Sequence, residues 1–153
     1  VVLPDIRWGR RDIKSIALLP NILAKQQAFE AGAKEAWLVD TQGYITEGAS
    51  TNCYIVRGGV IITHPANERI LGGVTRDVVL SLARAQGIKV EERPFTAEEA
   101  KSAEEAFITS TTLGVMPVVK INDAVIGNGH PRDMTQQLMR SYDRHVAELA
   151  SHA

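Results

Sequence analysis

The chain has 153 residues, of which 44% are hydrophobic and 23% charged, and this ordinary composition excludes a disordered tail, a collagen-like repeat and a disulfide-stapled miniprotein. Its 17 basic and 18 acidic residues give a net charge of -1, so we expect neither a nucleic-acid nor a membrane partner, and no apolar run approaches the roughly 18 residues of a membrane span. The single cysteine, Cys53, excludes an internal disulfide and a cysteine-based zinc cluster, and the four histidines lack metal-ligand spacing. We therefore expect one soluble, metal-free, cytoplasmic domain.

The sequence begins Val-Val-Leu-Pro, with no initiator methionine and no recognisable signal peptide. We expect it to be a piece of a longer polypeptide.

The first half of the chain predicts one helix and three strands. Apolar side chains recur at helical spacing over 18–31, and Gly32 follows as a stop signal. A short apolar strand at 37–39 precedes a turn at 41–43. Two β-rich runs follow, with a glycine pair between them that indicates a hairpin; they span 52–56 and 60–63.

The second half alternates helices with short strands. Thr75 is the expected N-cap of a helix that ends at Gly87, and Thr96 and Glu99 have capping-box spacing. Strands are expected at 88–93, 105–109, 115–121 and 124–126, and an amphipathic helix at 134–149. This mixture of hairpins and helices predicts an α/β or α+β domain with mixed sheets and flanking helices.

Two segments offer reactive or acidic groups. Lys14 lies between Ile13 and the apolar run 16–19, and a lysine held among apolar groups can act as a nucleophile; a solvated surface lysine is the alternative. The stretch 46–52 (TEGASTN) can place a carboxylate and several hydroxyls around a ligand, or can be a plain connection.

Two further segments could bind an anion. Gly72 and Gly73 precede the helix that contains Thr75, and the free N–H groups of a helix N-terminus favour phosphate, although no nucleotide-hydrolase motif is present. The run 109–112 (TSTT) ends a strand with hydroxyl groups, which either donate to a ligand or satisfy their own backbone.

The order of these segments along the chain is more informative than any one of them alone. The motifs DIKS (12–15), NILAKQ (21–26), TEGASTN (46–52), ILGGVTR (70–76) and TSTT (109–112) together resemble the class IV pyridoxal-phosphate aminotransferases, and within them the members specific for D-amino acids. The segments 92–96 (ERPFT) and 116–119 (MPVV) also fit. The resemblance implies the family's fold, fold type IV, and places residues 1–153 in its larger, C-terminal, cofactor-binding domain, with the smaller N-terminal domain absent from this chain.

The resemblance also implies roles for individual residues. Lys14 is similar to the lysine that forms the Schiff base with pyridoxal 5'-phosphate and then moves a proton, and Glu47 to the carboxylate that pairs with the pyridine nitrogen. The other implied cofactor-binding residues are Leu71, Gly73, Val74, Thr75 and Thr111, and the implied substrate-side residues are Ser50, Thr51, Asn52, Ser110 and Thr112.

The implied activity is transamination between a D-amino acid, such as D-alanine, and a 2-oxo acid, such as 2-oxoglutarate, in a homodimer. A branched-chain L-amino-acid aminotransferase or an aminodeoxychorismate lyase of the same fold is an alternative. A non-catalytic domain that keeps the fold, or a phosphate-ligand binding module, is another; the presence of both Lys14 and Glu47 argues against a scaffold.

Overall fold

A five-stranded mixed sheet forms the centre of the molecule. The computed structural model describes residues 1–151. The sheet has the order β6-β5-β4-β7-β8, and its strands are β4 (Asn52–Arg57), β5 (Val60–Thr63), β6 (Val90–Glu92), β7 (Glu105–Ser110) and β8 (Gly114–Pro117). The middle strand β4 pairs antiparallel with β5 and β7, whereas β5 and β6 run parallel because helix α2 (Val74–Ala85) connects them.

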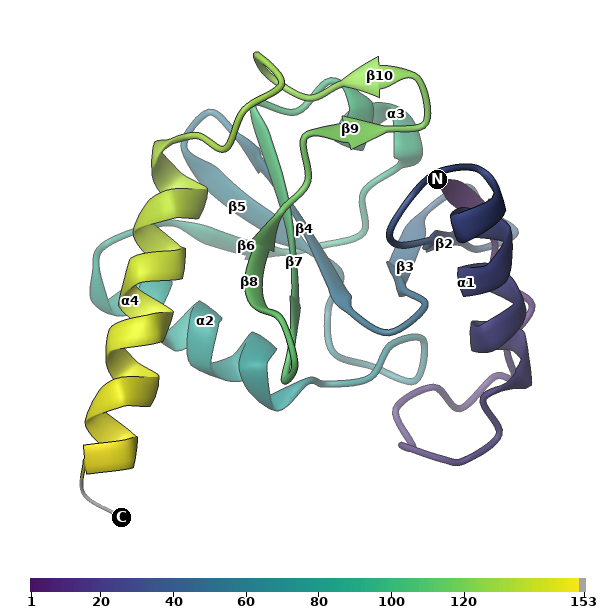
Figure 1. The fold of residues 1–153 in the computed structure, drawn as a ribbon, viewed down its shortest axis with the longest axis horizontal. Helices are drawn as coiled ribbons and strands as arrows, with labels where there is room; N and C mark the ends of the chain where they lie inside the picture. Colours follow the sequence, from purple (N-terminus) through teal and green to yellow (C-terminus); the bar gives the residue numbers. More distant parts are fainter. Residues whose placement is uncertain (152–153) are drawn as a thin grey trace.

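Both faces of this sheet are buried, and β4 shows how its sequence permits this. Its side chains alternate between two cores: Cys53 and Ile55 pack on one side, and Tyr54 and Val56 on the other. Helices α2 and α4 (Asp133–Ser151) cover the second side (Figure 1). A strand buried on both faces is a continuous apolar run, which is why 53–56 lacks polar alternation.

A smaller sheet lies beside the first and carries helix α1 (Leu19–Glu30) (Figure 1). It has the order β1-β2-β3, with β1 (Val2–Pro4) parallel to β2 (Trp37–Val39) and β2 antiparallel to β3 (Ile45–Gly48). The contact between helix and sheet uses mainly alanines, which allow close packing. The large apolar side chains of α1 face outward instead; they are Leu19, Ile22, Leu23 and Phe29.

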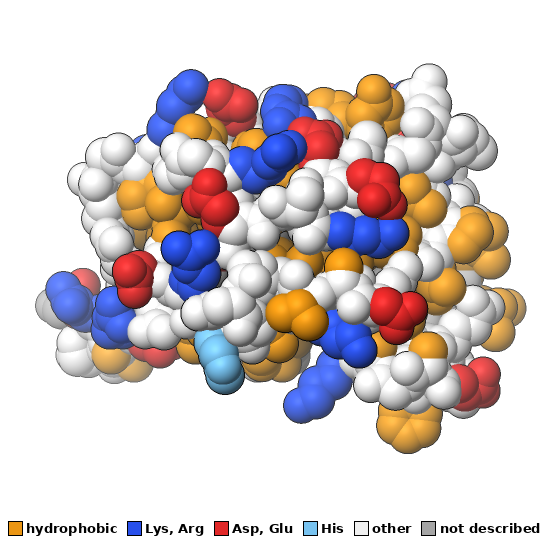
Figure 2. All heavy atoms as spheres, turned by 90° about the horizontal axis from the view of Figure 1, so that it is seen from above, with side chains coloured by type: hydrophobic (Ala, Val, Ile, Leu, Met, Phe, Trp, Pro, Cys, Tyr) orange, Lys and Arg blue, Asp and Glu red, His pale blue; other side chains and the backbone are white. Residues whose placement is uncertain are grey.

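The remaining elements close the first core. They are α3 (Ala97–Lys101), β9 (Lys120–Ile121) and β10 (Ala124–Val125). Trp37 packs edge-on against Phe95 in this core, with ring centroids 6.2 Å apart. Acidic and basic side chains alternate over the face seen in Figure 2. Among residues 1–151 no helix has the length and hydropathy to cross a bilayer.

The structure confirms the mixed α/β class and corrects several boundaries. The N-cap of α2 is Gly73 rather than Thr75, which lies one position inside the helix. The expected strand 115–121 divides into β8 and β9, although the Val118 N–H still donates to the Ala106 carbonyl of β7 at 2.8 Å. The expected strand 88–93 shortens to β6. The stretch 46–52 is not one loop, because β3 extends through Gly48 and β4 begins at Asn52. The capping box of Thr96 is confirmed.

Candidate functional site

Glu47 is a buried carboxylate surrounded by hydrogen-bond donors. It belongs to β3, and only 4% of its surface is exposed. Its Oε1 accepts from Arg7 Nη1 at 2.5 Å, and its Oε2 accepts from Asn52 Nδ2 at 3.1 Å. The backbone N–H of Leu71 donates to both oxygens, at 3.2 and 3.1 Å. An ionised carboxylate has about four acceptor positions, and these three donors make four hydrogen bonds with Glu47, so its acceptor capacity is fully used.

Arg7 is itself held by a second buried acid. Asp5 accepts from Arg7 Nε at 2.9 Å and from Arg7 Nη2 at 2.8 Å, which is the bidentate geometry of a strong pair. The Thr46 hydroxyl donates to the same carboxylate at 2.7 Å. Arg11 Nε lies 3.3 Å from Asp5 Oδ2. Two acids and two arginines therefore form a charge-balanced cluster beside β3.

The pKa values in this cluster follow from burial and charge. Burial raises the pKa of Glu47 to about 7, although the charge and hydrogen bond of Arg7 oppose the change. For Asp5, burial acts in the same direction, but the donors Arg7 and Thr46 and the charge of Arg11 lower its pKa below the ordinary value. Burial would lower the pKa of Arg7, but Asp5 and Glu47 raise it, so the guanidinium stays charged. Glu47 is consequently the member of the cluster whose charge changes most readily near neutral pH.

Lys14 lies close to this cluster on the long connection between β1 and α1. It borders a cavity of about 80 Å³ together with Arg7, Leu71 and Asn21. Arg7 and Leu71 both donate to Glu47, so Lys14 and Glu47 share two neighbours. Asn21 secures the start of α1 through a 2.7 Å hydrogen bond to the Ala49 carbonyl. The lysine is exposed rather than enclosed by apolar groups as the sequence suggested.

The N-terminal end of α2 lies against the other side of Asn52. Gly73 is the N-cap, and no side chain occupies the capping position over the first N–H groups, those of Val74 and Thr75 among them. A Cβ on Gly73 would collide with the Asn52 amide oxygen, so only glycine lets the helix approach this closely. The helix start presents the backbone donors that an anion requires, and Asn52 Nδ2 links it to the site by donating to the Leu71 carbonyl at 2.9 Å.

The hydroxyl run at the end of β7 reaches the same edge of the sheet. Asn52 pairs with Thr109, and the turn that follows contains Ser110, Thr111 and Thr112. The Ser110 and Thr112 hydroxyls are 3.2 Å apart, and Thr111 is exposed. Thr109 differs from them, because it is buried and its hydroxyl bonds to the Tyr54 hydroxyl at 2.9 Å.

The structure groups Ser50, Thr51 and Asn52 less closely than their adjacency in sequence suggests. Ser50 faces α1, where Lys25 Nζ donates to it at 3.0 Å and it donates to Glu35 at 2.9 Å. Thr51 is buried, and its hydroxyl occupies the space that a Cβ on Gly48 would need. Of the three, only Asn52 contacts Glu47 directly. Their assignment to the substrate stays a prediction.

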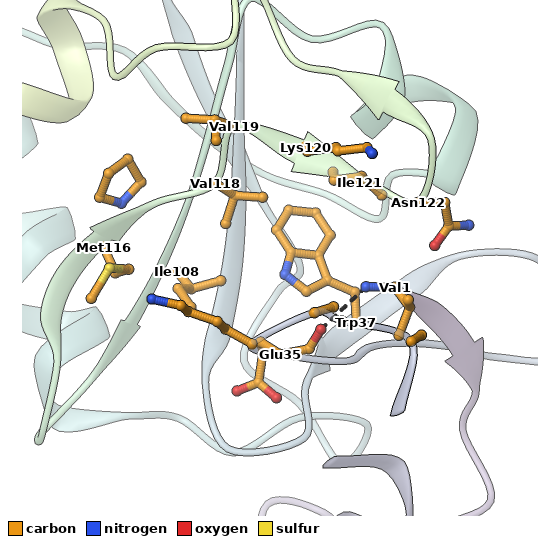
Figure 3. A pocket seen from close by; sticks show the side chains of 15 residues that line it. Val1, Glu35, Trp37, Ile108, Met116, Val118, Val119, Lys120, Ile121 and Asn122 are labelled. Carbon is orange, nitrogen blue, oxygen red and sulfur yellow. Dashed lines mark hydrogen bonds between the residues drawn. The ribbon is translucent and has the colours of Figure 1, made fainter. Parts of the chain in front are cut away.

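A larger cavity, of about 380 Å³, lies away from this cluster, and its lining is mainly apolar. It opens between β2 and the β8–β9 segment (Figure 3). Figure 3 shows the indole of Trp37 among Val118, Ile121 and Val1, with Lys120 and Asn122 farther out. Neither Lys14 nor Glu47 borders it. This cavity therefore does not contain the candidate chemistry.

Comparison with known proteins assigns the chain to a family. The family model described as "Amino-transferase class IV" matches residues 1–121. The chain belongs to the class IV aminotransferases. D-alanine aminotransferases of Bacillus licheniformis and Staphylococcus epidermidis are both 42% identical to it, over 95% of this chain and 51% of each relative. The chain thus spans about half the length of these curated relatives.

Solved structures of the family share the fold. The branched-chain amino acid aminotransferase of Thermobaculum terrenum in its PLP form superimposes with a TM-score of 0.85 at 32% identity, over 94% of this chain and 47% of that one. The Escherichia coli branched-chain enzyme gives 0.78 at 28% identity, over 91% and 49%. These matches confirm the resemblance to class IV aminotransferases that the motif order indicated.

The sequence did not reveal the residues that surround Glu47 in this class IV aminotransferase. Asp5 and Arg7 precede every motif, and neither was recognised as part of a site. One signal was available: the segment 5–12 carries five charged residues directly before Lys14, and charges that dense next to a candidate nucleophile suggest a network.

Proposed function

We propose that this chain is the cofactor-binding part of a pyridoxal-phosphate-dependent aminotransferase that exchanges the amino group of a D-amino acid, such as D-alanine, with a 2-oxo acid. The observation that carries the proposal is the buried Glu47 carboxylate, which shares the neighbours Arg7 and Leu71 with Lys14. Identity of about 40% to D-alanine aminotransferases, against about 30% to branched-chain structures, favours the D-amino-acid class.

The residues fit the cofactor in three respects. Glu47 is a buried carboxylate that can exchange the shared Leu71 N–H bond for a ring N–H, the α2 N-terminus offers backbone N–H groups for a phosphate, and Gly73 lets that end lie against Asn52. Bound pyridoxal phosphate supplies an electron sink for the substrate Cα–H bond. Lys14 would anchor it covalently, and its released amine would carry the proton to and from the substrate Cα.

The remaining predicted residues have supporting roles in this proposal. Leu71 would pack against the ring, and the N–H groups of Val74 and Thr75 with the Thr111 hydroxyl would hold the phosphate. Ser110 and Thr112 would line the substrate side, where their turn is exposed. Ser50 lies farther out, next to Lys25, and its role is the least supported.

The deciding experiment is the visible absorption spectrum of the full-length, cofactor-loaded protein before and after addition of D-alanine or, separately, L-leucine. We expect D-alanine alone to convert the cofactor to its amine form. Conversion by L-leucine alone would assign the protein to the branched-chain class, and pyruvate release without conversion would assign it to the lyases. Lys14→Ala should abolish the visible band, and a band that survives this substitution would refute the role of Lys14.

We also propose a cytoplasmic homodimer. The outward-facing side chains of α1 and the preceding segment, Ile16 among them at 99% exposed, form more apolar surface than single scattered residues would. Sedimentation of the full-length protein should show a dimer, and a stable, fully active monomer would contradict this. Cell fractionation tests the location.

A further inference from the structure

The guanidinium of Arg7 connects two buried carboxylates, and its donors are divided between them. Nε and Nη2 bond to Asp5, whereas Nη1 bonds to Glu47. Because the guanidinium is planar, the two bonds to Asp5 fix the plane in which Nη1 points. Asp5 is held in turn by the Thr46 hydroxyl, and its side chain is fully buried. The direction from which Glu47 receives its charged donor is therefore set by Asp5.

Arg7 is the charged group among the donors that contact Glu47. The other two, Asn52 Nδ2 and the Leu71 N–H, are neutral and satisfy the carboxylate oxygens without compensating its charge. Without Arg7 the cluster would hold two buried acids beside Arg11, whose contact is with Asp5 and not with Glu47. A buried carboxylate without a paired cation takes up a proton, and it then no longer offers a charged acceptor to the N–H of a ring nitrogen.

We propose that Arg7, oriented by Asp5, is a positioning residue that favours the ionised form of Glu47 and aims it at the ring nitrogen of the cofactor. The inference rests on the proposed function, and it adds a residue pair from the segment before Lys14 to the control of the cofactor's electronic state. Arg7 acts through Glu47 and does not itself touch the reacting atoms. A ring nitrogen that donates to an ionised Glu47 stays protonated, and this is the state that accepts electrons from the substrate.

A purely structural role for Arg7 makes a different prediction. Its bonds also tie the segment 5–18 to β3, so in a purely structural role its removal loosens the site and leaves the protonation of Glu47 unchanged. In that case Arg7→Lys and Arg7→Gln would lower the melting temperature, and the protonation of Glu47 and of the ring nitrogen would remain as in the wild type. Spectroscopy of the two protonation states therefore distinguishes the two roles, whereas a loss of activity does not.

The test uses the full-length protein in four variants: Arg7→Gln, Arg7→Lys, Asp5→Asn and the matched control Arg10→Gln. Arg10 lies in the same segment, but it is exposed and pairs with Asp12 at the surface. The first readout is the Glu47 carboxyl titration, followed by ¹³C NMR in cofactor-free protein and assigned with Glu47→Gln. The second is the ¹⁵N chemical shift of the ring nitrogen in protein loaded with ¹⁵N-labelled pyridoxal phosphate.

We expect Arg7→Gln to raise the titration midpoint of Glu47 by at least one pH unit and to shift the ring nitrogen toward its unprotonated value. It should lower kcat roughly tenfold or more, because one pH unit of differential protonation corresponds to a tenfold change in population. Arg7→Lys keeps a charge but loses the planar fork. Its Glu47 midpoint and its ring-nitrogen shift should therefore lie between those of the wild type and Arg7→Gln, and the same is expected for Asp5→Asn. Arg10→Gln should match the wild type in both readouts.

An unchanged Glu47 midpoint in Arg7→Gln would overturn the inference, and so would an Arg10→Gln effect of equal size. If Arg7→Gln does not fold, Arg7→Lys and Asp5→Asn decide by the same two readouts. A wild-type protein without a visible cofactor band would overturn the proposed function instead. The Glu47 titration in cofactor-free protein would still decide whether Arg7 controls its charge, so the two failures are distinguishable.

Discussion

The dependence of folding stability on pH should report the burial of Glu47. Its pKa rises from 4.5 to about 7 in the folded chain, so between these values the folded state binds more protons than the unfolded state. Stability from this group is therefore fully present below about pH 4.5, declines as the pH rises toward 7, and stays at its lower level above that. The two pKa values differ by about 2.5, which at about 1.4 kcal/mol per unit corresponds to a loss of about 3.5 kcal/mol.

The variant Glu47→Gln removes this titration. Its amide carries a single acceptor oxygen among the donors Arg7, Asn52 and Leu71, so we expect a pH-independent cost, but no loss between about pH 4.5 and 7. Urea unfolding of the cofactor-free, full-length protein across this range measures both profiles. The stability difference between wild type and variant should change by about 3.5 kcal/mol, in favour of the variant at the higher pH.

The control for this experiment is Glu98→Gln, because the side chain of Glu98 is 81% exposed. The pH dependence of its stability should follow that of the wild type, since an exposed ion pair contributes little to the free energy of unfolding. Parallel profiles for wild type and Glu47→Gln would refute the reasoning, because Glu47 would then titrate alike in the folded and unfolded states.

Three further substitutions test other parts of the structure. Phe107→Ala removes a fully buried ring and should cost about 3–5 kcal/mol in urea unfolding, whereas Leu149→Ala, at a position 60% exposed, should cost under about 0.5; equal costs would contradict the described core. Thr96→Ala removes the capping box of α3 and should lower stability by about 1 kcal/mol in the same assay, and an unchanged midpoint would argue against the cap. Gly73→Ala forces a Cβ into the Asn52 amide, so we expect weaker cofactor binding in a fluorescence titration, and unchanged affinity would show that the α2 N-terminus is not part of the site.

The sequence predicted those elements whose turn and capping residues alone specify the structure that the whole fold adopts. The hairpin of β4 and β5 is specified by a glycine pair between two β-rich runs, and the capping box of α3 by Thr96 and Glu99. The strands β1 and β3 escaped prediction because each is short, and β1 is held by a parallel partner more than thirty residues away in sequence. Local periodicity contains no information about such a partner.

In the candidate site, too, the local motifs were predictable and the tertiary packing was not. Lys14 and Glu47 were recognisable as members of ordered motifs, but the burial of Glu47 results from the packing of β3 against the segment that contains Arg7 and Leu71. Helix α1 shows the converse, because its apolar residues predicted the helix correctly but not the direction they face. Its buried side is composed of alanines, and hydrophobicity alone does not distinguish a core face from an exposed one.

The position of β4 at the centre of the large sheet has a consequence for the order in which a newly made chain can acquire its cofactor. Asn52, at the start of β4, pairs with Thr109 of β7, more than fifty residues later in the sequence. Translation supplies Lys14 and Glu47 early, but the strand that flanks Asn52 emerges from the ribosome only after α2 and α3. Such distant pairing is slow to form, so we expect cofactor capture to follow completion of β7 and nascent chains halted before it to leave pyridoxal phosphate unbound.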